Sequence, residues 1–341
     1  MTVETLWFCL AAFLLTGYVI LDGFDLGAGI VHRWLTRSDE ERRQVLASIG
    51  PVWDGNEVWL LATGGTLFLA FPAVYASSFS GFYLPLMIVL WLLVLRGIAI
   101  EFRNHFHHAV WTPLWDSVFA AASLLLAVFY GAALGNVVRG VPLDSRQEFF
   151  LPLWTNFAPG VEPGILDWYT IAVGLTAASA LAMHGAAWVR LKTLGDLSER
   201  AAVAALAAAR ITFVLTLVIT AMTFYIQPLV AANFELHPWG VVFPAAALAG
   251  LAGVLRFGTS EKTAFLSSCV YLAGMMSSAA FGVYPYLLPS CASGPGLNVS
   301  NAAAPAYGLA VGLTWWLPGM ALACAYAFFV YRRFAGKIPL S

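Results

Sequence analysis

The sequence GYVILDGFDLGAGI, residues 17–30, places two carboxylates, Asp22 and Asp25, inside an apolar segment that is long enough to form a helix. A second apolar segment, GPVWDGNEVWLL, carries Asp54 and Glu57 in the same way. One charged side chain at the centre of a membrane-spanning helix costs about 2.5 to 3.5 kcal/mol on insertion scales. Such groups are kept where they face protein, water or a partner, so the four carboxylates indicate an ion or proton pathway.

The composition is that of a polytopic membrane protein. Of the 341 residues, 60% are hydrophobic and only 10% are charged, whereas a soluble domain has about 25% charged residues. The net charge of -1 and the lack of a basic patch exclude nucleic acid as a partner. The four cysteines have no CxxC spacing, so neither a disulfide framework nor a zinc site is predicted. The first apolar stretch exceeds signal-peptide length, and we expect it to be kept as a membrane helix.

Hydropathy predicts an all-α fold with nine membrane spans, since about 20 apolar residues cross the hydrocarbon core. The predicted spans cover residues 5–31, 50–74, 79–102, 113–139, 164–190, 203–228, 238–257, 262–287 and 306–331. A basic linker, KTLGDLSER at 192–200, separates residues 1–191, a four-helix bundle of spans 1 to 4 leading into span 5, from residues 201–341 with spans 6 to 9. This division predicts two four-helix bundles plus one peripheral helix.

The positive charges orient the predicted bundle, because cytoplasmic loops carry an excess of Lys and Arg. Of the 17 such residues, all but four follow spans 1, 3, 5, 7 and 9 and therefore share one side. The exceptions are Arg139 and Arg146 on the other side and Arg96 and Arg210 within spans. This bias predicts a periplasmic N-terminus, a cytoplasmic C-terminus and two periplasmic loops, at 140–163 and 288–305.

The acidic residues of spans 1 and 2 are expected at one depth, in the cytoplasmic third of the bilayer, because a helix rises 1.5 Å per residue. Residues three apart share a helix face, so each acidic pair can line a common cleft. Other polar and aromatic residues of spans 2, 3 and 4 complete this layer. They are Trp53, Asn56, Arg96, Glu101 and Asp116.

Three interpretations of this acidic layer stay open. In the first, it is a route by which protons enter from the cytoplasm, with Asp54, Glu57 and the two aspartates of span 1 exchanging protons with water. In the second, the layer only joins helices, and Arg96 neutralises one or two carboxylates. In the third, Asp22, Asp25 and Asp116 hold a cation, because hard cations bind several carboxylate oxygens.

The histidines and tryptophans give weaker signals. A haem ligand must lie deep in a helix bundle, and only His184 is clearly within a span, so we expect no haem ligand and no metal site in this chain. The other histidines lie at helix ends or in loops, at His32, His105, His107, His108 and His237. The run HFHH, at 105–108, is interpreted as a solvated cytoplasmic turn. Four tryptophans surround the acidic layer as interfacial anchors or as a surface for quinone stacking: Trp53, Trp59, Trp111 and Trp115.

Longer stretches around the acidic motifs resemble subunit II of the cytochrome bd quinol oxidases, including the cyanide-insensitive branch. The similar segments are GYVILDGFDLGAGI and IGPVWDGNEVWLLATGGTLFLAFPAVYASSFSGFYLPL, at 49–86, with LWDSVF at 114–119, GNVVRGVPL at 135–143 and YPYLLPS at 284–290. The resemblance covers nearly the whole chain. Its most specific part is DGFD followed about 30 residues later by WDGNE, each in its own predicted helix.

The resemblance implies a heterodimer in the bacterial cytoplasmic membrane that oxidises quinol and reduces dioxygen to water. It places haems b558, b595 and d and the quinol-oxidising loop in subunit I, and no redox metal in subunit II. It also implies a proton route along the subunit interface that uses the acidic residue of the WDGN motif, here Asp54. Membrane lipids, quinone, also as a structural ligand, and small single-span accessory subunits are the further partners that it allows.

Two other functions remain alternatives at this stage. A proton- or cation-coupled secondary transporter would be expected to show inverted repeats and broken helices, and the sequence shows no clear repeat. A purely structural subunit would stabilise a haem-bearing partner without moving protons. Haem absorbance that co-purifies with the chain favours the oxidase subunit or the structural subunit, whereas a colourless lone protein favours the transporter.

Overall fold

Helices make up almost all of the computed structural model of this chain. The structure describes residues 2–103, 105–106, 108–160, 162–256, 260–292 and 294–338. His107, in the predicted HFHH turn, and Phe257, the predicted end of span 7, lie outside the described residues.

The elements follow one another along the chain with short connections, apart from two longer loops. The helices are α1 Val3–Leu35, α2 Asp39–Ile49, α3 Trp53–Ala70, α4 Pro72–Gly81, α5 Tyr83–Phe102, α6 Trp111–Arg139, α7 Trp168–Lys192, α8 Gly195–Ile226, α9 Pro228–Leu236, the 3-10 helix η1 Pro238–Val241, α10 Val242–Arg256, α11 Glu261–Val283 and α12 Ala306–Arg333. Two short strands, β1 Tyr286–Leu288 and β2 Leu297–Asn298, pair antiparallel.

Within the described residues, eight helical segments are long and apolar enough to cross a membrane. They are α1, α5, α6, α7, α8, η1 with α10, α11 and α12, and they correspond to eight of the nine predicted spans. The remaining predicted span, 50–74, corresponds to α3, which has 18 residues and carries Asp54, Asn56 and Glu57 near its start. It ends before Pro72, which opens α4, because proline disfavours a helical conformation in the residue before it.

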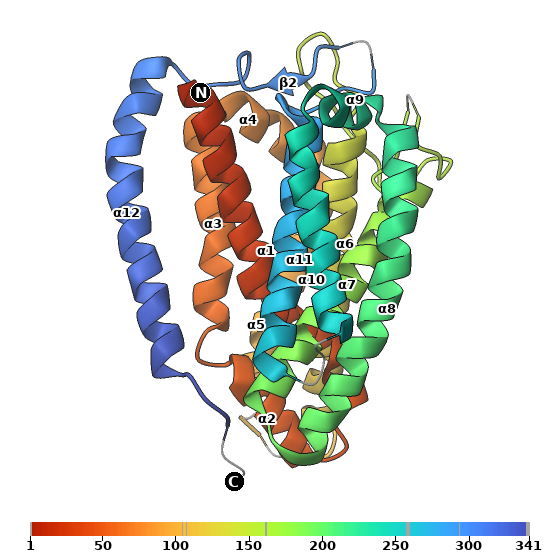
Figure 1. Ribbon diagram of the computed structural model, residues 1–341, viewed down its shortest axis with the longest axis vertical. Coiled ribbons are helices and arrows are strands. Elements are labelled where there is room, and N and C mark those ends of the chain that lie inside the picture. The colour runs from red at the N-terminus through yellow and green to blue at the C-terminus, as the bar shows by residue number, and fades with distance from the viewer. Residues whose placement is uncertain are drawn as a thin grey trace.

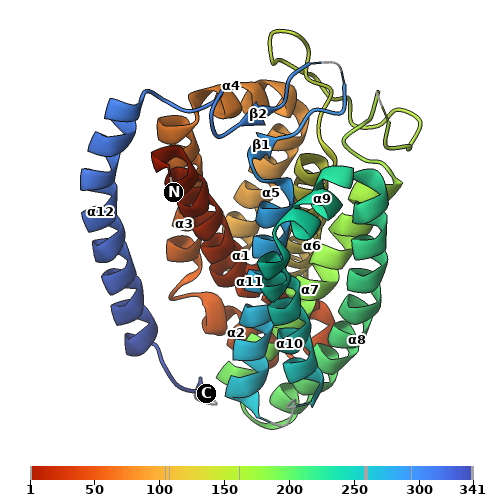
Figure 2. The ribbon, with the colours of Figure 1, turned by 45° about the horizontal axis from the view of Figure 1, so that its top comes forward.

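Helix α1 lies at the centre of the fold and packs against α3, α6, α7 and α11. Its crossing with α7 is very close: a Cβ at Gly27 would lie 1.9 Å from the carbonyl oxygen of Leu181, and one at Gly185 would lie 2.0 Å from the carbonyl carbon of Gly27. Small residues allow this backbone contact. Helix α5 packs on α6, α8 and α11 pack on α7, and α10 packs on α11 and α8 (Figures 1 and 2).

The segment predicted as a linker, 192–200, is mostly helical. Helix α8 begins at Gly195, so only Thr193 and Leu194 separate it from α7. Helix α8 therefore starts eight residues before the predicted span. Hydropathy did not predict these first residues of α8, because the sequence before residue 203 is polar and lies outside the apolar part of the helix.

Helix α12 stands at the edge of the molecule and packs mainly against α1 and α3 (Figures 1 and 2). Three hydrogen bonds hold it along its length. Trp7 Nε1 donates to the carbonyl of Leu309 at 3.1 Å, Trp316 Nε1 to Thr66 at 3.2 Å, and the Tyr331 hydroxyl to Asn56 at 2.7 Å.

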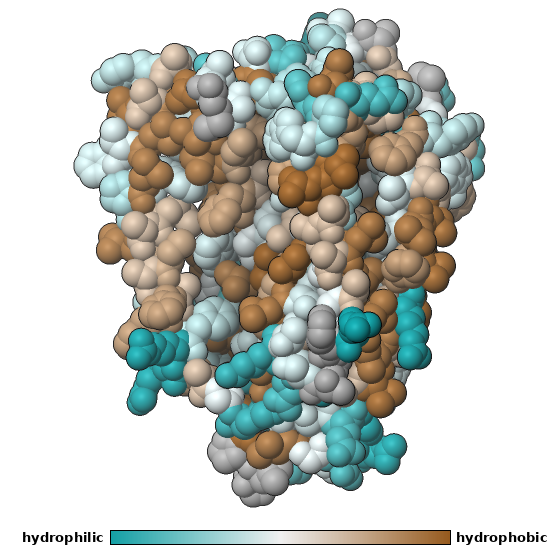
Figure 3. All heavy atoms as spheres, in the orientation of Figure 1, coloured by the Kyte–Doolittle hydropathy of each residue, from teal (hydrophilic) through white to brown (hydrophobic). Residues whose placement is uncertain are grey.

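The two ends of the molecule differ from its middle. Hydrophobic residues spread over the middle of the face in Figure 3, and hydrophilic residues gather at its lower end. Helix α2 lies at that end, where Trp188 Nε1 donates to the carbonyl of Ser48 at 3.1 Å and the amide of Ile338 donates to the carbonyl of Lys192 at 2.8 Å. The chain begins at the opposite end, where Thr5 meets Tyr284.

The loops after α6 and α11 meet at the end where the chain begins. The amide of Val141 donates to the carbonyl of Pro289, and the amide of Cys291 donates to the carbonyl of Val141, both at 3.0 Å. Beneath them Arg139 forms a buried ion pair with Asp167, which also caps the first turn of α7. The described parts of the predicted loops 140–163 and 288–305 are therefore joined by hydrogen bonds at this end, while residues 161 and 293 lie outside the described residues.

Candidate functional site

A buried arginine joins three helices through the predicted acidic motifs. Arg96 of α5 is fully buried, and its Nη1 donates to both carboxylate oxygens of Asp22 in α1, at 2.8 and 2.9 Å. Its Nη2 donates to Glu57 of α3, whose side chain is 26% exposed. A guanidinium is always charged and presents several donors, so it can hold two carboxylates at once.

Asp25, one turn after Asp22, is also fully buried but has no cation of its own. Its Oδ2 accepts a hydrogen bond from Asn56 Nδ2 at 2.7 Å, and its Oδ1 meets no hydrogen-bond partner among the described residues. Asn56 Nδ2 also donates to the carbonyl of Leu21 at 3.1 Å, and its Oδ1 accepts from Tyr331. This set of residues around Arg96 is called the Arg96 cluster below.

The charges of the Arg96 cluster do not balance. Three carboxylates, Asp22, Asp25 and Glu57, face one guanidinium, so the fully ionised cluster would carry an excess of two negative charges. An uncompensated buried charge costs several kcal/mol. The cluster can lower this cost by holding a proton, because a neutral carboxyl group is both donor and acceptor.

Asp54 lies outside the cluster, on the outer face of α3. It is exposed, and it makes no ion pair within the part of the chain that the structure describes. Its neighbours on that face are apolar and also exposed: Val58 by 53%, Leu61 by 73% and Phe68 by 64%. The expectation that Asp54 and Glu57 line one cleft is therefore wrong. At 3.6 residues per turn they diverge by about 60°, and the boundary between interior and surface passes between them.

Asp116 belongs to a different cluster, near the end where α2 lies. Its Oδ1 contacts His32 Nε2 at 2.8 Å and Arg103 Nε at 2.6 Å, and its Oδ2 lies 3.5 Å from Arg42 Nη1. Arg103 also donates to Asp39 at 2.6 Å. Burial opposes the charge on Arg103, but its hydrogen bonds to Asp116 and Asp39 raise its pKa.

The structure thus does not bring Asp116 together with Asp22 and Asp25, as the predicted cation site required. Asp116 is held by Arg103 and His32, and no group of three or more His, Cys, Asp or Glu side chains with metal-binding spacing occurs among the described residues. Glu101 is exposed and does not join the Arg96 cluster either. The predicted acidic layer is therefore two separate clusters and two exposed carboxylates, Asp54 and Glu101.

The four tryptophans of the predicted layer also lie in different places. Trp53 packs beside Gly97 of α5, where a Cβ would lie 3.5 Å from the indole, and Trp59 packs against Gly17 of α1. Trp111 and Trp115 contact each other at the start of α6, with ring centroids 5.5 Å apart. Only Trp53 is close to the Arg96 cluster.

His184 is fully buried, and both of its ring nitrogens are in hydrogen bonds. Nδ1 lies 2.7 Å from Ser268 Oγ, and Nε2 lies 2.9 Å from the carbonyl oxygen of Ile20. Its ring stacks on Phe265 with centroids 4.9 Å apart. These contacts describe a packed histidine whose two nitrogens are engaged by the protein itself.

Sequence reasoning missed Tyr331, which reaches the Arg96 cluster from the far end of the chain. No spacing signal connects Tyr331 with Asn56, because they lie on helices whose contact depends on the tertiary fold. It also missed Asp167, whose position before an apolar helical segment is a recognisable N-cap signal.

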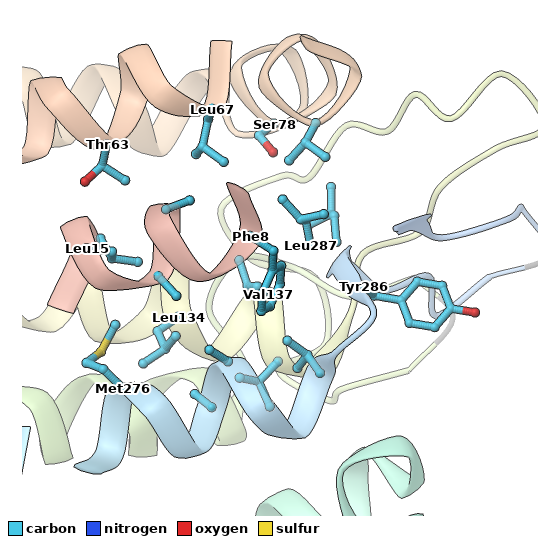
Figure 4. A pocket seen from close by; sticks show the side chains of 18 residues that line it. Phe8, Leu15, Thr63, Leu67, Ser78, Leu134, Val137, Met276, Tyr286 and Leu287 are labelled. Carbon is cyan, nitrogen blue, oxygen red and sulfur yellow. The ribbon is translucent and has the colours of Figure 1, made fainter. Parts of the chain in front are cut away.

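An apolar cavity of about 200 Å³ lies in the half of the molecule away from α2. Side chains of α1, α3, α4, α6, α11 and β1 line it, and Figure 4 shows Phe8, Val137 and Leu287 together at one part of its wall. The ring of Tyr286 points away from the others (Figure 4). Thr63 and Ser78 bring hydroxyl groups to a lining that is otherwise almost entirely hydrocarbon.

The sequence model of one protein family, described as cytochrome bd terminal oxidase subunit II, matches residues 3–334. The chain belongs to this family. It is 31% identical over 347 residues to cytochrome bd ubiquinol oxidase subunit 2 of Bacillus subtilis (strain 168), covering 100% of this chain and 99% of the relative. It is 30% identical over 364 residues to the probable cytochrome oxidase subunit 2 of Haemophilus influenzae, with coverages of 98% and 94%.

Two further relatives agree with the cytochrome bd subunit II family. Cytochrome bd-I ubiquinol oxidase subunit 2 of Escherichia coli K12 is 35% identical over 209 residues, which are 61% of this chain and 54% of that protein. A chain in the structure of the bd oxidase from Geobacillus thermodenitrificans superposes with a TM-score of 0.77 at 18% identity, covering 98% of this chain and 99% of that chain, which shows the shared fold. The resemblance inferred from DGFD and WDGNE is confirmed.

Proposed function

We propose that this chain is the haem-free subunit of a membrane quinol:dioxygen oxidoreductase, that it stabilises a haem-bearing subunit I, and that Asp54 delivers protons from the cytoplasmic side toward that partner. The observation that carries the proposal is the position of Asp54. It is a carboxylate on a helix face that is otherwise apolar and exposed.

A carboxylate in that position would be expensive if lipid covered it. Asp54 lies in the first turn of α3, so this cost is smaller than the about 2.5 to 3.5 kcal/mol that insertion scales give for a charge at the helix centre. A second subunit seated on the same face would remove this cost, because it can supply hydrogen-bond partners and water. The exposed apolar residues Val58, Leu61 and Phe68 supply the hydrophobic area of such an interface.

The Arg96 cluster supplies the inner part of the proposed route. Glu57 connects the two regions, because it pairs with Arg96 on one side, keeps 26% exposure on the other and follows Asp54 by three residues. Asp22 and Asp25 lie behind it, fully buried. In this arrangement the negative charge of the Arg96 cluster attracts a proton, and Asp54 passes that proton to subunit I.

We propose α3 as the ninth membrane span. Its 18 residues extend over about 27 Å, close to the 30 Å of a typical hydrocarbon core. The charge bias then places α2 and Ile338 in the cytoplasm and Val3 in the periplasm. The packing of α1, α3, α5 and α6 on one side and α7, α8, α10 and α11 on the other supports two four-helix groups, with α12 peripheral.

Within the part of the chain that the structure describes, the two buried histidines, His184 and His32, do not fit a haem. His184 is the histidine expected deepest in a span, and its hydrogen bonds to Ser268 and Ile20 occupy both ring nitrogens. His32 is buried with its Nε2 on Asp116. The haems b558, b595 and d of the family are therefore proposed for subunit I.

The apolar cavity of Figure 4 fits the hydrocarbon part of a membrane molecule. Apolar cavities of this size stay dry and accept apolar ligands, and lipids and quinones are the apolar molecules that a bilayer supplies. We propose that the cavity holds one acyl or isoprenoid chain as a structural ligand. Small single-span accessory subunits remain further proposed partners. Membership of the family leaves no support for the secondary transporter.

The experiment that tests the proposed function replaces Asp54 in the complete complex. Asp54→Asn keeps the shape but removes the exchangeable proton, so we expect quinol oxidase turnover to fall severalfold while haem content stays near normal. Asp54→Glu should keep part of the activity. Wild-type turnover of a fully haem-loaded Asp54→Asn complex would leave the structural role as the function of this subunit.

A further inference from the structure

One oxygen of the Arg96 cluster has no partner. Asp25 is fully buried, and its two carboxylate oxygens differ in their hydrogen bonds. Oδ2 accepts from Asn56, whereas Oδ1 meets no donor among the residues that the structure describes. A buried acceptor without a partner is costly, about 1 to 3 kcal/mol and more for a charged group, so this atom points to something that it binds.

The orientation of the Asn56 amide can be derived from its neighbours. The carbonyl oxygen of Leu21 can only accept, so the group 3.1 Å from it must be the Nδ2 donor of Asn56. The same Nδ2 then donates to Asp25 Oδ2. The amide oxygen is left for Tyr331, whose hydroxyl must donate to it. The hydrogen-bond chain Tyr331, Asn56, Asp25 therefore has one direction, and it ends on Oδ2.

The charges around Asp25 favour a positive ligand. The ionisable groups that face it are Asp22 of its own helix, Glu57 of α3, Arg96 of α5 and Tyr331 of α12. Arg96 is already engaged by both Asp22 and Glu57. Asp25 therefore lies next to two carboxylates without a cation to itself, and a proton on its free oxygen removes its charge and creates a donor there.

We propose that Oδ1 of Asp25 binds one exchangeable proton, and that Asn56 and Tyr331 are positioning residues that reserve this oxygen for it. The proton comes from hydronium that reaches Glu57, an O–H bond forms at Oδ1 and water is released. The role of this site in oxygen reduction rests on the proposed proton route. The proton on Asp25, however, is observable without turnover, and one of its two positioning residues, Tyr331, comes from the peripheral helix α12.

Infrared spectroscopy of the purified complex in lipid nanodiscs tests the proposal. We expect the difference between spectra in H₂O and D₂O to contain the C=O stretch of a protonated, buried carboxyl group, and we expect Asp25→Asn to lose it. Tyr331→Phe removes the hydrogen bond to the amide oxygen, leaves the Leu21 carbonyl and Asp25 as the described partners of Asn56, and should shift this band. Tyr326→Phe is the matched control, because Tyr326 is on the same helix and 67% exposed, and it should leave the band unchanged.

The outcomes separate this proposal from the proposed function. Carboxyl bands that are identical in wild type and Asp25→Asn overturn the proposal that Asp25 holds a proton. Spectra that change when sodium is added but not when D₂O replaces H₂O overturn it as well. If Asp25→Asn does not assemble, Tyr331→Phe decides, and an unshifted band refutes the positioning role. A band present in Asp54→Asn with unimpaired turnover supports the Asp25 site while refuting delivery by Asp54. Slow turnover of Asp54→Asn, together with the absence of a carboxyl band from Asp25, supports proton delivery by Asp54 and refutes the proton on Asp25.

Discussion

The replacement of Arg96 by Gln should be among the most destabilising single changes in this chain. Arg96 and Asp22 are both fully buried, and two hydrogen bonds of 2.8 and 2.9 Å join them. Removal of one partner of a buried ion pair costs about 3 to 5 kcal/mol, because the other charge stays buried without compensation. Glu57 adds little to this figure, since it is 26% exposed and water screens it.

The magnitude can be separated from general damage by a double-mutant cycle. Asp22→Asn removes the charge that Arg96→Gln leaves behind, so the double variant should recover at least about 2 kcal/mol of the loss expected for the broken pair. The assay is the free energy of unfolding of the complex in mixed micelles, from titration with SDS. Arg332→Gln is the control, because Arg332 is exposed at the end of α12.

Two results would refute this reasoning. One is an Arg96→Gln complex as stable as the Arg332→Gln control, which would mean that the buried pair contributes nothing. The other is a double variant that is less stable than the wild-type complex by the sum of the two single-variant losses. Additive losses would show that Arg96 and Asp22 act independently, contrary to the distances between them.

Three further predictions follow from the packing, the topology and the histidines. Gly27→Ala should prevent assembly with subunit I, because its Cβ would lie 1.9 Å from the Leu181 carbonyl oxygen, whereas Gly319→Ala on the peripheral helix α12, with nothing within 4 Å, should assemble normally; equal yields of the two complexes would contradict this. Cysteine at position 40 should react with a membrane-impermeant reagent only from the cytoplasmic side, and cysteine at position 144 only from the periplasmic side; the reverse pattern would invert the topology. His184→Ala should leave the haem spectrum of the complex unchanged, and the chain purified alone should show no haem absorbance; stoichiometric haem on the lone chain that disappears in His184→Ala would overturn the assignment of haems to subunit I.

The sequence predicted the spans because hydropathy is a property of each segment alone. Eight of the nine predicted spans correspond to helices long and apolar enough to cross a membrane. The short helices α2 and α9 were not predicted, because neither is long enough to span and α2 is strongly polar. The start of α8 was placed too late for a related reason, since its first two turns are polar.

The candidate site was predicted only in part, because it depends on how helices rotate and tilt. The motifs selected Asp22, Asp25 and Glu57, which the structure brings together, and the interpretation that Arg96 neutralises one or two carboxylates agrees with its contacts to Asp22 and Glu57. The depth of a residue does not reveal its partner, so Asp116 was grouped with Asp22 although it pairs with Arg103 and His32. The contact of Tyr331 with Asn56 spans 275 residues and has no local signal.

The central claim, that Asp54 delivers protons to the partner subunit, is tested most directly by proton uptake during a single turnover. A fully reduced complex in vesicles is mixed with oxygen, and a pH-sensitive dye follows protons taken from the cytoplasmic side. We expect Asp54→Asn to slow this uptake severalfold with normal haem content, and Asp54→Glu to restore most of the rate. Proton uptake by Asp54→Asn at the wild-type rate and stoichiometry would contradict the claim.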